Sequence, residues 1–91
     1  MATNNDVKSE FARIASLPFV ELDVRHLEAP EPMKAILQAL QNLPAQSWLK
    51  VVHRREPFPL YQILSENGFR FHRQVIADGF QIAIWRISNN G

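Results

Sequence analysis

The chain has 91 residues, enough for one compact domain with a modest core, and its 46% hydrophobic and 21% charged content is that of an ordinary globular protein. Its 10 basic and 9 acidic residues leave a net charge of +1, so no overall field marks it for nucleic acid or an acidic substrate. Cysteine is absent, which excludes disulfides, thiolate metal sites, persulfide carriage and thiol catalysis.

No uncharged run approaches the roughly 18 apolar residues that a membrane span needs. No basic segment followed by an apolar run opens the chain, so we see no signal peptide. We therefore expect a cytoplasmic protein that makes no membrane contact.

The first 17 residues differ in pattern from the rest. Apolar side chains recur there at helical spacing, at Val7, Phe11, Ile14 and Leu17. This stripe predicts a short helix that lies on the domain, in preference to a separate binding segment. We divide the chain into a partly helical N-terminal extension (1–17), a domain (18–87) and a disordered tail (88–91).

The domain alternates between patterns of period two and patterns of helical period. The first kind predicts strands over Phe19–Arg25, Ser47–His53, Phe69–Ile76 and Phe80–Ile87. The second kind predicts helices over Pro30–Leu43 and Pro57–Asn67. Asp78-Gly79 between the last two strands is a strong hairpin signal.

The order strand, helix, strand, helix, strand, strand predicts a two-layer α/β sandwich of the α+β type. Each strand–helix–strand crossover should be right-handed and should join parallel strands, so both helices lie on one face of the sheet. The hairpin makes the last strand antiparallel. The N-terminal helix is an addition to this βαβαββ unit.

A junction between the first strand and the first domain helix carries a specific likeness. Residues 22–32 read Leu-Asp-Val-Arg-His-Leu-Glu-Ala-Pro-Glu-Pro. This stretch resembles the signature of the SirA/TusA sulfur-carrier family: leucine, aspartate, any residue, arginine, glycine, leucine, any residue, then cysteine-proline-any-proline. Here His26 replaces the glycine and Ala29 replaces the cysteine that carries the persulfide. The resemblance therefore does not imply sulfur-carrier activity.

A second stretch, His53–Tyr61, reads His-Arg-Arg-Glu-Pro-Phe-Pro-Leu-Tyr. Together with residues 29–33 it resembles the cysteine-free bacterial relatives called domain of unknown function 2249, which occur alone or fused to hemerythrin-like and other redox-associated domains. The likeness implies a mixed sheet of strand order 1-2-4-3, shared with the C-terminal domain of translation initiation factor three, but names no reaction. The motif positions are Asp23, Arg25, Ala29, Pro30, Glu31, Pro32, Pro57 and Pro59.

Titratable side chains follow the first two predicted strands. Ligands of α/β sheets favour the crevice beyond the C-terminal strand ends. Both domain helices should begin at the same edge, where unpaired N–H groups could bind an anion. For the acidic residues we favour helix capping and pairing with the arginines over ligand binding. The candidate ligand edge comprises Arg25, His26, Glu28, Glu31, His53, Arg54, Arg55 and Glu56.

Metal binding and catalysis find little support in the sequence. His26 and His53 could approach one another, but no histidine pair has the spacing of a metal site, so we predict no metal and no cofactor. An acid–base pair of His53 and Glu56 would lack a nucleophile, so we predict no enzyme.

The sheet face turned away from the two domain helices is a second candidate. With strand order 1-2-4-3, Trp48 and Trp85 become cross-strand neighbours on a face more apolar than solvent requires. We expect another protein, a second copy, or the N-terminal helix to cover it. RNA stacking is an alternative that the near-neutral charge disfavours. The candidate interface face comprises Trp48, Lys50, Val52, Arg70, His72 and Trp85.

These patterns predict a non-catalytic protein-interaction or regulatory module, which the resemblance links to redox or sulfur metabolism. The alternatives are small-anion or metabolite binding at the strand ends and RNA binding on the open sheet face.

Overall fold

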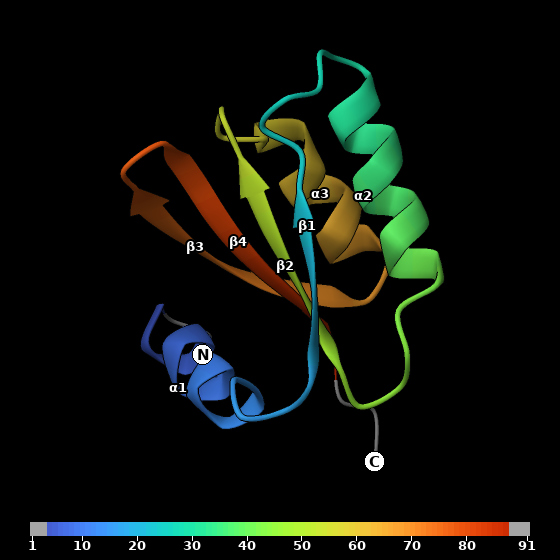
Figure 1. Ribbon diagram of the computed structural model, residues 1–91. Coiled ribbons are helices and arrows are strands. Elements are labelled where there is room, and N and C mark those ends of the chain that lie inside the picture. Colours follow the sequence, from blue (N-terminus) through green and yellow to red (C-terminus); the bar gives the residue numbers. More distant parts are fainter. Residues whose placement is uncertain (1–3, 88–91) are drawn as a thin grey trace.

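The computed structural model describes residues 4–87 (Figure 1). Its elements in chain order are α1 (Asn4–Ile14), β1 (Phe19–Asp23), α2 (Glu31–Gln41), β2 (Trp48–His53), α3 (Phe58–Glu66), β3 (Phe69–Ile76) and β4 (Gly79–Arg86). Every predicted element is present, and the bounds of β3 agree at both ends. The predicted disordered tail, 88–91, lies outside the described residues. No helix between residues 4 and 87 is long and apolar enough to cross a membrane.

The four strands form one mixed sheet of order β1-β2-β4-β3. β1 and β2 are parallel, and β4 is antiparallel to both of its neighbours. This confirms the predicted architecture. Figure 1 shows α2 and α3 together on one face of the sheet, with α1 on the opposite face.

The main core lies between the sheet and the two domain helices. Alternate residues of the central strands point to this side, so β2 contributes Leu49 and Val51 and β4 contributes Ile82 and Ile84, all of them fully buried. The apolar stripes of α2 and α3 meet them, with Ile36, Leu40, Leu60 and Leu64 at the centre.

A smaller core lies on the other face, under α1. Trp48 and Trp85 are 5% and 3% exposed there, and the apolar stripe of α1 packs over them. The ring of Phe11 sits 5.2 Å from Trp48, 5.3 Å from His72 and 5.6 Å from Trp85, centroid to centroid. The indole Nε1–H of Trp48 donates to the carbonyl of Leu17 at 3.2 Å.

The candidate interface face is therefore closed by the chain itself, which is the self-cover alternative. Arg70 is held to α1 by an ion pair of 3.2 Å with Glu10. Val52, further along the same face, is also buried, and Lys50 is half-buried with its amine 5.5 Å from the Phe19 ring. The exposed apolar patch that the strand pattern predicts is not present, and the tryptophans cannot serve as a stacking platform while α1 is docked.

Candidate functional site

A cavity of about 460 Å³ lies where β1 and β2 end, between the starts of α2 and α3. We call it the strand-end cavity. Its apolar lining comes from Val24, Leu27, Ala29, Pro30, Pro32, Met33, Pro57 and Pro59. Its polar lining comes from Glu28, His53, Arg54, Arg55 and Glu56. Five of the eight residues of the candidate ligand edge thus share one cavity.

His53 ends β2 on the same side as Leu49 and Val51, which is the side of the domain helices. Its Nδ1 accepts a hydrogen bond from the backbone N–H of Arg55 at 3.1 Å. Burial, followed by the charges of Arg54 and Arg55, lowers the pKa of His53 below its ordinary value. The ring is therefore neutral at pH 7, and because Nδ1 accepts, its proton is on Nε2.

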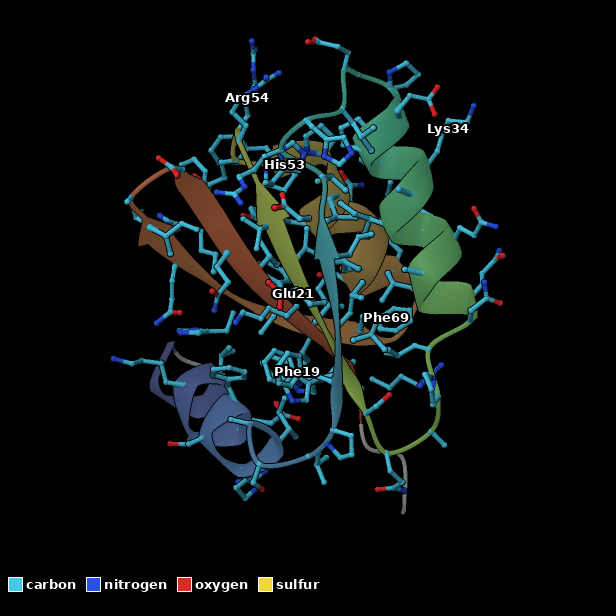
Figure 2. All side chains as sticks on the ribbon, viewed as in Figure 1. Phe19, Glu21, Lys34, His53, Arg54 and Phe69 are labelled. Atoms are coloured by element: carbon cyan, nitrogen blue, oxygen red, sulfur yellow. The ribbon has the colours of Figure 1, made fainter. Side chains whose placement is uncertain are left out.

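The two arginines after β2 are exposed and differ in their partners. Figure 2 shows Arg54 reaching beyond the end of β2, whereas His53 lies closer to the domain helices. Arg54 comes within 3.8 Å of the Glu28 carboxylate, a long contact that joins the two loops of the cavity. Arg55 makes no ion pair with any residue between 7 and 87.

Most of the backbone donors that the sequence suggests at the helix N-termini are not available to a ligand. Pro32 and Pro59 have no N–H. The first-turn amides of Glu31, Lys34, Phe58 and Leu60 already donate to nearby carbonyls of the chain. Helix α2 begins at Glu31, with Pro30 as its N-cap, one residue later than predicted. These six positions therefore have no free amide to offer an anion, which makes side chains the more important donors at this edge.

The predicted capping role of the acidic residues is observed only in part. Neither domain helix has a side-chain hydrogen bond at its N-cap. Glu31 lies in the first turn of α2, where its charge suits the helix dipole, and it approaches Lys34 at 3.8 Å. Glu56 turns instead toward the outer strand of the sheet.

Glu56 is the centre of a network that the sequence analysis missed. Its Oε2 accepts a hydrogen bond from the Tyr61 hydroxyl at 3.0 Å and forms an ion pair with Arg73 Nε at 2.7 Å. The Tyr61 ring stacks on Phe71 at 4.3 Å. Burial, followed by the hydrogen bond to Glu56, raises the pKa of Tyr61 above its ordinary value, so the phenol remains a donor. This network fixes the loop that carries Arg54 and Arg55.

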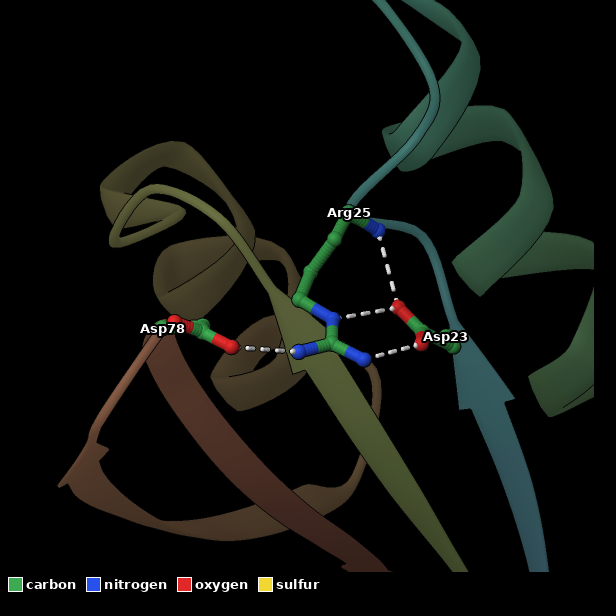
Figure 3. A network of polar contacts seen from close by, with 3 residues as sticks. All are labelled: Asp23, Arg25 and Asp78. Carbon is green, nitrogen blue, oxygen red and sulfur yellow. Dashed lines mark hydrogen bonds and ion pairs between the residues drawn. The ribbon is translucent and has the colours of Figure 1, made fainter.

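Arg25, His26 and Glu31 do not line the cavity. Arg25 donates through Nε and NH2 to both carboxylate oxygens of Asp23, at 3.0 and 2.7 Å, and through NH1 to Asp78 at 3.4 Å (Figure 3). These bonds, with the Arg25 backbone N–H, lower the pKa of Asp23 to about 2. The predicted ligand residue Arg25 therefore serves as a clasp between β1 and the β3–β4 turn, and His26 is exposed beside it.

The fold and the cavity together define a small α+β sandwich with a largely apolar pocket at the ends of its parallel strands. The chain belongs to the uncharacterised conserved protein family DUF2249, whose model matches residues 21–86. That range runs from β1 to the end of β4, so it includes the whole cavity and leaves α1 outside. No curated protein and no solved structure matches the chain. The wider resemblance to SirA/TusA proteins and to initiation factor three stays a prediction.

Proposed function

We propose that this domain is a non-catalytic binding module that takes a small organic anion into the strand-end cavity. The observation that carries the proposal is an apolar wall beside the guanidinium of Arg55, which forms no ion pair with a carboxylate of residues 7–87. A link to redox or sulfur metabolism rests on the resemblance of the fold alone.

The charges around the cavity favour an anion over a cation. Of its two lining carboxylates, Glu56 is held by Arg73, which lies outside the lining. Glu28 is shared at long range with Arg54. Arg55 is left to bind a carboxylate, which a guanidinium can contact through two parallel hydrogen bonds. The Nε2–H of His53 offers a second donor from the cavity wall.

The lining also indicates what kind of anion fits. Eight lining residues are apolar, and a bare inorganic ion would leave their surface in contact with water. A volume of about 460 Å³ lies within the usual range of small-molecule sites. We therefore favour a carboxylate with a branched or aromatic body over inorganic phosphate or sulfate.

Binding without conversion is the simplest use of this cavity. No serine, threonine or cysteine lines it, and Ala29 stands where the resembling sulfur carriers hold their thiol. His53 commits Nδ1 to the backbone of Arg55, so its ring has one nitrogen left for a ligand. Such a module would report the presence of its ligand to another protein or domain.

A thermal-shift experiment with benzoate, isovalerate, inorganic phosphate and neutral benzamide tests the proposal. A carboxylate at tenfold its Kd should stabilise by about 1.4 kcal/mol, which raises Tm by several degrees in a domain of this size. Arg55→Gln should remove the shift, whereas Arg13→Gln on α1, the matched control, should keep it. The proposal is wrong if no carboxylate stabilises the protein, if benzamide matches benzoate, or if Arg55→Gln keeps the full shift.

A further inference from the structure

A second concave surface lies along the outer strand of the sheet, away from the strand-end cavity. It is a groove of about 710 Å³. Residues 69–73 of β3 all line it, although successive side chains of a strand point to opposite faces. A groove that meets both faces must follow the open edge of the strand. α1 borders it with Val7 and Lys8, and α3 borders it with Tyr61 and Ser65.

The backbone of this edge has hydrogen-bonding groups to offer. β3 is the last strand of the sheet and pairs with β4 alone. In an antiparallel pair, alternate residues direct their N–H and C=O groups toward the partner, and the others direct them away. Figure 1 shows β3 as the outer strand of the sheet. Unpaired edges of this kind bind extended peptides as an additional strand.

The charge of the groove indicates which peptide fits. Among residues 7–87, its charged lining residues are Lys8, Arg70 and Arg73, and no carboxylate of that range lines it. Arg70 pairs through Nε with Glu10 at 3.2 Å, and Arg73 pairs through Nε with Glu56 at 2.7 Å. Their side chains are 39% and 46% exposed. The ion pairs with Glu10 and Glu56 offset part of the positive charge of the two arginines. The exposed Lys8 adds to the positive charge that remains in the groove.

We propose that the β3 edge binds an extended acidic peptide of another protein, which adds a fifth strand to the sheet. Arg70 and Arg73 lie three residues apart and on opposite faces of β3. The acidic residues of the peptide should therefore also be three apart, so that each faces one arginine. Between them, the residue opposite Phe71 should be apolar, since Phe71 faces the aromatic side of the groove with Tyr61.

A second copy of this chain is a poorer occupant of the edge. Antiparallel pairing of β3 with itself centred between residues 71 and 72 would place Arg70 opposite the Arg73 of the copy. A register centred on residue 70 or on residue 73 would place that arginine opposite its own copy. Like charges directly opposite one another on a sheet are destabilising. The charges that discourage self-pairing are the ones that an acidic strand would satisfy.

The test uses the wild-type chain and fluorescein-labelled Gly-Ser-Glu-Val-Thr-Glu-Val-Ser-Gly. Anisotropy should show saturable binding that weakens as salt rises. A matched peptide with lysine in place of both glutamates should bind at least about tenfold more weakly, because two attractive charge contacts become repulsive. A peptide with proline in place of the central threonine should lose binding, because proline cannot complete a strand ladder.

Amide chemical shifts in ¹⁵N-labelled protein locate the peptide. Binding should perturb residues 69–73 and leave His53, Arg54 and Arg55 unchanged, so the outcome is independent of whether the strand-end cavity binds anions. The variant Lys8→Glu should weaken binding about threefold, whereas Lys34→Glu, at a lysine on α2 that is also exposed, should not. Absent binding at millimolar peptide, equal binding of the lysine peptide, shifts at the cavity alone, or tighter binding of an oligouridine to the same amides would each overturn the proposal.

Discussion

Replacing Phe11 with alanine removes the ring that holds α1 against the sheet. Phe11 meets Trp48 edge-on at 88° and lies nearly parallel to His72 and Trp85, at 25° and 24°. Both tryptophans of the chain lie in this cluster, so their fluorescence reports whether α1 is docked.

The cost follows from three contributions. Deleting a core phenylalanine side chain typically costs about 3–5 kcal/mol, transfer and cavity terms together. Phe11 is only partly buried, which lowers that range. Its three ring contacts act in the other direction, since an aromatic pair adds about 0.5–1.5 kcal/mol beyond its buried area. We expect a loss of about 3 kcal/mol, a large part of the 5–15 kcal/mol that stabilises a typical domain.

Urea unfolding followed by tryptophan emission measures this loss. For an m-value of about 2 kcal/mol/M the midpoint should fall by roughly 1.5 M. The native emission of Phe11→Ala should also shift to the red, because water reaches indoles that are 5% and 3% exposed in the intact fold. Phe58→Ala is the control, since Phe58 is 67% exposed, and its cost should stay below about 1 kcal/mol. An unchanged midpoint with unshifted emission in Phe11→Ala would refute the docking of α1 over the tryptophans.

Three further perturbations test other parts of the structure. Gly79→Ala should cost more than about 2 kcal/mol in urea unfolding, because φ is +141° and the added Cβ would meet a carbonyl at the end of β2, whereas Gly68→Ala, with φ +81° and open space, should cost about 1 kcal/mol. Equal costs would contradict this reading. Tyr61→Phe removes the hydrogen bond to Glu56 and should lower stability by about 1–2 kcal/mol; an unchanged urea midpoint would count against the network. Burial, followed by the charge of the lysine on α1, lowers the pKa of His72, so the unfolded chain binds the proton more readily. The stability that the neutral His72 ring contributes is fully present above the pKa of the unfolded chain, near 6.5, and is lost as pH falls below that value. His72→Phe should therefore flatten the decline of Tm between pH 7 and pH 5. A decline parallel to that of the wild type would disprove the effect.

The fold was accessible from sequence because its signals are local. β3 begins with alternating apolar and polar residues, Phe-Arg-Phe-His, and Asp78-Gly79 predicts the turn to β4. The right-handed crossover rule then places α2 and α3 on one face without any long-range information. For α1 the sequence favoured packing on the domain, but which surface the helix covers was left open, for the opposite reason. Its apolar stripe can pack on a partner or on its own sheet, and only the three-dimensional arrangement decides between them.

The site was only partly accessible, because its pairings join residues far apart in the chain. Pro57 and Pro59 indicate the correct edge of the sheet, where β1 and β2 end. Glu56, however, pairs with Arg73 rather than with the adjacent Arg54 or Arg55. One signal could have revealed this: Arg73 shares the helix-facing side of β3 with Phe71, and a charge on that side requires a partner.

The clasp and the helix starts escaped prediction for related reasons. Arg25 bonds to Asp78 across a sequence separation of 53 residues, which no local pattern encodes. The first-turn amides donate hydrogen bonds to nearby carbonyls only because of the path that each loop takes into its helix, which the sequence does not show. The sequence alone does show that the motif prolines at positions 32 and 59 have no backbone N–H to donate to a ligand.

Ala29 lies exposed at the rim of the strand-end cavity in a chain that has no cysteine of its own. A cysteine introduced by Ala29→Cys would be the single thiol of the protein, and the nearby guanidiniums would favour its reactive thiolate form. Its rate of alkylation would then depend on whether the rim is open to solvent. A compound that occupies the cavity would slow the alkylation of this cysteine. Unlabelled compounds could therefore be ranked by how strongly they lower the alkylation rate.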